Sequence, residues 1–163
     1  MKRFSLKLSG NLVALAMVSA ISIGAAEAQG RFGQVKSVVS VSQTGAGNGA
    51  AVSQTGAANA AGVSQNGVNN VGKVIQSGAD NAGVIKQRGS NNDATLTQVG
   101  TGNAACVVQV GKNLSADVVQ QGKGQSLGIA QTNQGAFAIR ASDCKYEPQV
   151  FAAWQRWGYR GAN

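Results

Sequence analysis

The sequence predicts an all-β protein, a parallel β-solenoid of the cross-β type that is built from 11-residue strand-turn units, two units per coil. Three observations lead to this fold class. Glutamine recurs nine times at a constant spacing of eleven residues, an aliphatic residue stands two positions before each glutamine, and glycine stands two positions after all but the last. Repetition this regular is typical of solenoid architectures. After the repeat, we expect an irregular C-terminal tail.

The first element is a predicted secretory signal peptide over residues 1–28. It begins with basic residues, continues with an apolar run over 12–23 and ends in the small-residue site Ala26-Glu27-Ala28, after which we expect cleavage. The apolar run falls well short of the roughly 20 residues that a membrane-spanning helix needs. A short lead segment, 29–36, follows, and the mature protein is therefore expected in the periplasm or outside the cell.

The repeat itself occupies residues 37–131, and its unit reads Gln-x-Gly-x-x-Asn-x-Ala-x-Val-x. The glutamine column contains Gln43, Gln54, Gln65, Gln76, Gln87, Gln98, Gln109, Gln120 and Gln131. The apolar column contains Val41, Val52, Val63, Val74, Ile85, Leu96, Val107, Val118 and Ile129. The glycine column contains Gly45, Gly56, Gly67, Gly78, Gly89, Gly100, Gly111 and Gly122. The asparagine column contains Asn48, Asn59, Asn70, Asn81, Asn92 and Asn103.

The residue types of the unit favour strands over helices. An 11-residue period also occurs in right-handed helical supercoils, but glycine, asparagine and β-branched residues disfavour a helix by up to about 1 kcal/mol each. Within a unit, the fixed positions, such as 48, 50, 52 and 54, are two apart and so share one face of a strand. We expect strands at 37–43, 48–54 and onward to 125–131. Four-residue turns such as Thr55-Gly56-Ala57-Ala58 join them, with the glycine column in the turn.

Two such units complete one coil, so that alternate strands stack in one parallel sheet and the remaining strands in a facing sheet. Stacking like on like lets the buried amides of the glutamine and asparagine columns form ladders of hydrogen bonds, while the small residues between them let the sheets approach closely. The end coils present open strand edges. The predicted chain is therefore suited to continue into another chain.

The unit, as it stands over Gln43–Gln54 and Gln98–Gln109, closely resembles the curlin repeat of bacterial curli fibre subunits, and the resemblance covers residues 37–131. It implies a secreted structural subunit of an extracellular functional amyloid fibre at the bacterial cell surface, which serves cell adhesion and biofilm formation. The partners that it implies are further copies of the chain, other curlin subunits, an outer-membrane secretion pore and the cell surface. The uniform 11-residue series and basic final segment are more similar to the minor, nucleating subunit than to the major one.

Composition argues against several other functions. The chain contains no histidine, the commonest general base and zinc ligand, and we expect no catalytic, cofactor-binding or metal site. The outward positions are too mixed for an ice-binding threonine array, and the turns lack the regular aspartates of calcium-binding solenoids. The repeat has few basic residues and no aromatic residue, which argues against specific nucleic-acid binding. The alternative function is a monomeric secreted β-solenoid that acts as a binding module at the cell surface.

Residues 132–163 form a basic, aromatic C-terminal tail of a different kind. It contains every tryptophan and tyrosine of the chain, and residues 136–140 are expected to form a last, irregular strand. We interpret the tail as an anchor to the cell surface, as a cap, or as a segment folded over the solenoid end. The two cysteines, Cys106 and Cys144, are even in number and follow a signal peptide, so we expect a disulfide bond, with two free thiols as the alternative.

Overall fold

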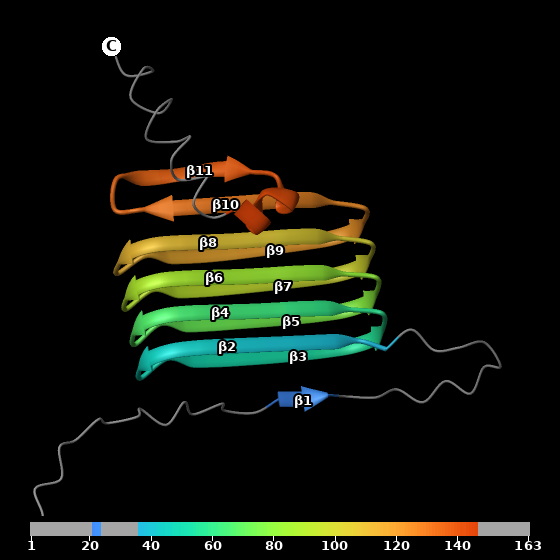
Figure 1. The fold of residues 1–163 in the computed structure, drawn as a ribbon. Coiled ribbons are helices and arrows are strands. Elements are labelled where there is room, and N and C mark those ends of the chain that lie inside the picture. The colour runs from blue at the N-terminus through green and yellow to red at the C-terminus, as the bar shows by residue number, and fades with distance from the viewer. Residues whose placement is uncertain (1–20, 24–35, 147–163) are drawn as a thin grey trace, which may run out of the picture.

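A computed structural model of the protein describes residues 21–23 and 36–146, and most of them lie in stacked β-strands (Figure 1). Nine strands correspond to the nine repeat units: β2 (Val38–Ala46), β3 (Gly49–Ala57), β4 (Ala60–Val68), β5 (Val71–Ala79), β6 (Ala82–Ser90), β7 (Asp93–Thr101), β8 (Ala104–Lys112), β9 (Ser115–Lys123) and β10 (Ser126–Thr132). A short strand, β1 (Ile21–Ile23), precedes them. The strand β11 (Gly135–Ile139) and the 3₁₀-helix η1 (Ala141–Tyr146) follow.

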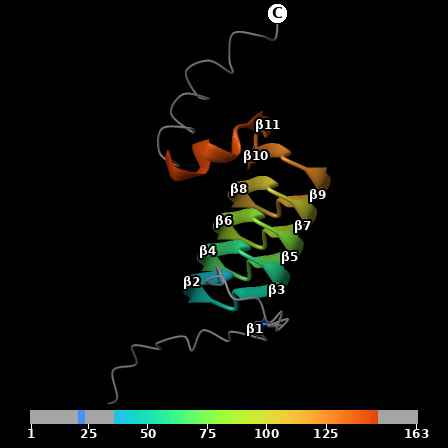
Figure 2. The same ribbon diagram turned by 90° about the vertical axis from the view of Figure 1, so that its right-hand side faces the viewer.

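Consecutive repeat strands alternate between two sheets. One sheet has the order β11-β10-β8-β6-β4-β2 and the other the order β1-β3-β5-β7-β9. All neighbouring repeat strands are parallel, and the view in Figure 2 shows the two sheets face to face, with the chain passing from one to the other at every turn. The predicted parallel β-solenoid with two units per coil is confirmed.

The register between stacked strands is constant at 22 residues. Gln65 pairs with Gln87, and Val63 pairs with Ile85, and the same offset holds along every pair of parallel repeat strands. Because parallel strands lie about 4.8 Å apart, each inward column becomes a row of like side chains along the solenoid axis.

The predicted strand and turn lengths need correction. Strands β2 to β9 are nine residues long rather than seven, and the turns contain two residues, such as Ala58-Asn59, rather than four. The asparagine column therefore lies in the turns. The glycine column, which was expected in the turns, lies near the end of each strand. The first turn residue has positive φ at eight turns: Gly47, Ala58, Asn69, Asp80, Asn91, Gly102, Asn113 and Gly124. A single left-handed residue reverses the chain, and seven of these eight are glycine, asparagine or aspartate, which tolerate that conformation best.

The strand glycines combine a positive φ with a very close approach between the backbones of neighbouring layers. Gly89 has φ +120°, and a Cβ atom on it would collide with the carbonyl oxygen of Gly111 in the next layer. The φ angle alone would tolerate few other residues. The close contact with the neighbouring backbone leaves no space for any side chain at this position.

The core is a thin row of small and aliphatic side chains between the two sheets. It contains the buried residues Ala50, Val52, Ala61, Val63, Val74, Ile85, Ala94, Leu96, Ala105, Val107 and Val118. Large side chains on one sheet lie opposite small residues on the other. The large side chain of Leu96 packs where Gly83 leaves space, and a Cβ atom added to Gly83 would lie 2.8 Å from a Leu96 methyl carbon. Large and small residues thus interdigitate across the sheets.

The two ends of the solenoid differ. At the N-terminal end, β1 pairs in parallel with β3, and β1 belongs to the predicted signal peptide, whose cleavage site lies outside the described residues. At the C-terminal end, the chain reverses after Thr132, and β11 returns antiparallel on β10, close to the predicted irregular strand. The aromatic residues after Tyr146 lie outside the described residues.

We predict that Gly89→Ala lowers the free energy of unfolding by at least about 1–3 kcal/mol, because alanine is strained at this φ and its methyl group collides with the next layer. Gly49→Ala is the matched control: Gly49 is not in the positive-φ region, and no heavy atom lies within 4 Å of its added Cβ. Denaturant unfolding of the freshly prepared monomer measures both changes. Equal midpoints for the two variants would contradict the close-approach argument.

Candidate functional site

The inward glutamines form two continuous ladders of side-chain hydrogen bonds. In each step, Nε2 of one glutamine donates to Oε1 of the glutamine 22 residues later, as from Gln54 to Gln76 at 2.7 Å. One ladder runs through Gln43, Gln65, Gln87, Gln109 and Gln131, and the other through Gln54, Gln76, Gln98 and Gln120. The step distances are 2.6–2.9 Å, which is the normal range for such bonds. The structure thus places every member of the glutamine column in one of these two ladders.

A second bond from each ladder amide joins the two sheets. Nε2 of Gln98 also donates to the carbonyl oxygen of Ala82, the first residue of the preceding strand in the facing sheet, at 3.1 Å. The same bond, 16 residues back along the chain, recurs from Gln54 to Gln131. Both N–H groups of an internal glutamine are therefore used, and the side chains of Gln98 and Gln109 are completely buried.

The asparagines stack at the turns and satisfy the backbone there. The Oδ1 atom of Asn48 accepts from both the backbone N–H and the Nδ2 of Asn70, each at 3.0 Å. Nδ2 of Asn70 also donates to the carbonyl oxygen of Gly89, a member of the glycine column, at 3.0 Å. After the last asparagines, only backbone groups continue this pattern: the backbone N–H of Leu114 donates to Oδ1 of Asn92, and that of Gln125 donates to Oδ1 of Asn103. The asparagine and glycine columns are therefore coupled at each of the six turns that carry an asparagine.

The glutamine ladders have a direction, and this leaves unequal groups at their ends. At the N-terminal end, the buried Oε1 atoms of Gln43 and Gln54 have no hydrogen-bond partner among the described residues. At the C-terminal end, Gln120 and Gln131 accept the last ladder bonds, but Nε2 of each donates only to the facing backbone, so that each retains one N–H group without an acceptor in the described part of the chain. One end thus offers two acceptors and the other two donors.

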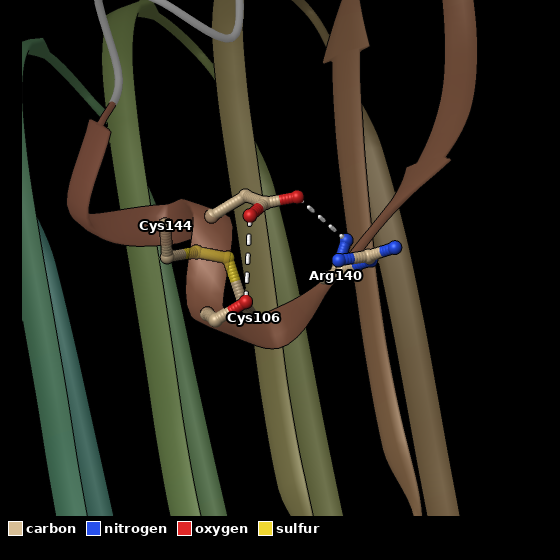
Figure 3. The surroundings of a disulfide bond; sticks show 5 residues. Cys106, Arg140 and Cys144 are labelled. Atoms are coloured by element: carbon tan, nitrogen blue, oxygen red, sulfur yellow. Dashed lines mark hydrogen bonds between the residues drawn. A yellow bond between two sulfur atoms is a disulfide. The ribbon is translucent and has the colours of Figure 1, made fainter.

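The start of the C-terminal tail packs on the outer face of the six-stranded sheet. A second apolar cluster forms there from Cys106, Val108, Ala130 and Cys144, with Phe137 and Ile139 of β11 at its border. The structure joins Cys106 on β8 to Cys144 on η1 in a disulfide bond, and both cysteines are buried (Figure 3).

The turn into η1 has its own hydrogen bonds. The backbone N–H of Arg140 donates to Oδ2 of Asp143 at 3.2 Å, and the backbone N–H of Asp143 donates to the carbonyl oxygen of Arg140 at 2.9 Å. The first bond is the capping interaction that a helix N-terminus makes with an acidic side chain in its first turn, and the second is the backbone bond of the 3₁₀ turn itself. They fix the direction in which the chain leaves β11 and place Cys144 over β8.

Sequence reasoning missed two features of this site. It did not identify the left-handed first turn residues, although the glycine, asparagine or aspartate before most of the asparagine column is a signal for them. It also did not identify the direction of the ladders, which depends on how each amide is oriented. Within the described residues, no cluster of three or more potential metal ligands occurs, and no helix there has the length and hydropathy to cross a membrane.

Comparison with known proteins identifies the repeat. Residues 67–100, which include three successive asparagine-to-glutamine segments from β5 to β7, match the family model of the curlin associated repeat. Over these residues, the chain is similar to the curlin family. Searches of curated proteins and of solved structures found no significant match.

We predict that Gln98→Leu lowers the free energy of unfolding by about 2–5 kcal/mol. The change removes the acceptor for Gln76 and the donor to Gln120, and it leaves both of these buried groups unpaired. Ser53→Ala, at an exposed outward position, is the control and should shift stability by less than about 0.5 kcal/mol. Denaturant unfolding measures both variants, and equal shifts would contradict the inward assignment of the ladder.

Proposed function

We propose that the protein is a structural subunit of an extracellular, curli-type amyloid fibre that serves cell adhesion and biofilm formation. The observation that carries this proposal is the constant 22-residue register, because it gives every layer the same inward groups. A layer from another chain with the same columns would meet the same partners as a layer of this chain. Self-association by edge-to-edge stacking therefore uses contacts that the fold already contains.

The curlin match and the β-solenoid favour a structural role without catalysis. The inward faces carry small apolar groups and amides, and the amides inside the stack are hydrogen-bonded to one another. They offer nothing that would act as a nucleophile or general base. We infer that the chemistry which recurs in every repeat unit is hydrogen bonding between layers.

The route to the cell surface is a further part of the proposal. Residues 1–28 would direct export and be removed, and the mature chain would leave the cell through an outer-membrane pore of the kind that curli subunits use. Other curlin subunits would be its partners in the fibre. These inferences depend on the sequence pattern and on the resemblance to curlins.

Within the fibre, we propose that this chain is the surface-attached nucleator. The hairpin of β10 and β11 interrupts the solenoid at one end, whereas the described residues form no comparable hairpin at the other end. A chain with one stackable end and one end that carries a basic, aromatic tail is suited to start a fibre at an anionic surface.

The same hairpin favours the alternative function, a monomeric binding solenoid at the cell surface. Terminal elements that close the hydrophobic core are usual in soluble repeat proteins. The alternative predicts a protein that stays monomeric at high concentration, and assembly behaviour therefore separates the two functions.

We expect the purified mature protein, residues 29–163, to form cross-β fibres in at least one redox state of its two cysteines, with reflections near about 4.7 and 10 Å. Assembly is followed by dye binding, and aligned fibres are examined by X-ray diffraction, with the cysteines both bonded and reduced. A soluble, dye-negative monomer after days at high concentration under both conditions would exclude the fibre function and favour the binding module.

We also expect truncation after Ser142 to leave fibre formation in solution intact but to release the product from the cells into the medium. The ladder residues all precede the cut, whereas the proposed surface-binding tail follows it. Full-length Cys144→Ser is the control that separates loss of the tail from loss of the disulfide. Truncated protein that remains on the cells, or that no longer assembles, would contradict this division of roles.

A further inference from the structure

The N-terminal layer has the features of a stacking face. Strand β2 has no neighbour on its outer edge among the described residues, and Gln43 and Gln54 direct unpartnered, buried Oε1 atoms toward that end. Among the described residues, the strand at that end is β1, which pairs with three residues of β3 and belongs to the predicted signal peptide. In the mature chain, both sheets would therefore be open at this end.

The C-terminal layer is closed in one sheet. Strand β11 occupies the edge of β10, and its antiparallel register places Ala136 opposite Gln131 and Ala138 opposite Ile129. The side chain of alanine has no acceptor for the spare N–H of Gln131, and it is smaller than the aliphatic side chains of the apolar column. The five-stranded sheet ends at β9, so the six-stranded sheet extends two strands further. A second chain cannot stack on both sheets at this end while the hairpin is in place.

The disulfide holds this closure in position. It ties η1 to the outer face of β8, and the tied segment between Thr132 and Cys144 contains β11. With its start fixed by β10 and its end fixed by Cys106, β11 cannot move far from the edge that it covers.

We propose that the Cys106–Cys144 disulfide limits assembly of the solenoid to one end. The N-terminal layer can stack on the C-terminal layer of a second copy. The chain's own C-terminal layer becomes available for stacking only when the disulfide is opened. This proposal deepens the proposed fibre function. In the contact, Nε2 of Gln120 and of Gln131 from the incoming copy donate to the open Oε1 atoms of Gln43 and Gln54. Acceptors meet donors only in this head-to-tail arrangement, because two N-terminal layers would bring acceptors against acceptors.

Once the disulfide is open, an incoming copy competes well for the edge of β10. The hairpin pairs five residues of β10, from Gly128 to Thr132, whereas the parallel pairing of β10 with β8 extends over seven residues. An incoming repeat strand that paired in the same way would gain this longer pairing and restore the amide ladder. Opening the bond needs a dithiol reductant. One thiolate displaces one Sγ, the second thiol displaces the other, and the two electrons and two protons that the cysteines gain come from the dithiol, which becomes a disulfide.

The test uses full mature chains with one end disabled. In β2, the N–H of Val38 points to β4, so in the parallel ladder the N–H of Val41 points to the open edge. Val41→Pro therefore blocks stacking at the N-terminal layer without removing an internal bond, as edge strands tolerate proline. Val41→Ala is the matched control, because it shortens the same side chain and keeps the N–H. Cys106→Ser with Cys144→Ser gives an unlocked chain, and thiol titration verifies the bond in the wild type.

Sedimentation velocity then measures the assembly state. We expect the unlocked chain to polymerise, and both the oxidised wild type and the unlocked Val41→Pro chain to remain monomeric alone. Mixing these last two should double the mass to a one-to-one dimer and no further, since only one N-terminal and one C-terminal layer are available. Unlocked Val41→Ala should polymerise like its parent.

Three results would overturn the proposal: oxidised wild type that polymerises as readily as the unlocked chain, dimers of unlocked Val41→Pro alone, or no dimer in the mixture. Circular dichroism verifies the fold of each variant, and Val39→Pro, whose N–H faces the same edge, replaces Val41→Pro if that chain does not fold. A dimer in the mixture without fibres from the unlocked chain would support this inference and refute the fibre function, so the two can fail separately.

Discussion

The hydrogen bonds between like side-chain amides are the interaction on which the rest of the structure depends. The core is only one aliphatic side chain deep in each layer, and the space beside it is filled by glutamine and asparagine. A buried amide group without a partner costs about 1–3 kcal/mol, so the fold is stable only because each amide inside the stack meets another. The hydrogen-bond partner of each amide is the equivalent residue of the neighbouring coil. The amides therefore specify the register as well as contributing to stability, and a slip of one residue would turn every column outward.

The turn geometry follows from this requirement. A two-residue turn with one left-handed residue places the asparagine side chain where it can reach both the asparagine below and a glycine carbonyl oxygen above. That carbonyl is accessible because the strand glycine approaches its neighbour more closely than any side chain would permit. At each corner that has an asparagine, three residues thus depend on one another: the strand glycine, the left-handed turn residue and the asparagine. The choice of residue type at each position is narrower because of the other two.

The sequence predicted what depends on periodicity and missed what depends on local conformation. The eleven-residue spacing with inward positions two apart was sufficient for the two sheets, the coil and the inward columns, because a strand has a side-chain period of two. It placed Gly56 in a turn because glycine commonly occupies turns, whereas here positive φ occurs inside the strand. The reversal after Thr132 was visible only as the loss of the repeat at Asn133. The direction of that reversal follows from the packing of Phe137 and Ile139 on the outer face, which no periodic pattern encodes.

Because the two sheets carry the same inward columns, the length of the solenoid is not restricted to whole coils. Gain or loss of one 11-residue unit would move every later strand into the opposite sheet, where it would meet identical glutamines, asparagines and aliphatic residues. The hairpin and its disulfide would move with them, since Cys106, β10 and η1 all lie within the last two coils. Genes for such a protein can therefore change in steps of 33 base pairs, an odd or even number of times, and still encode a closed C-terminal end.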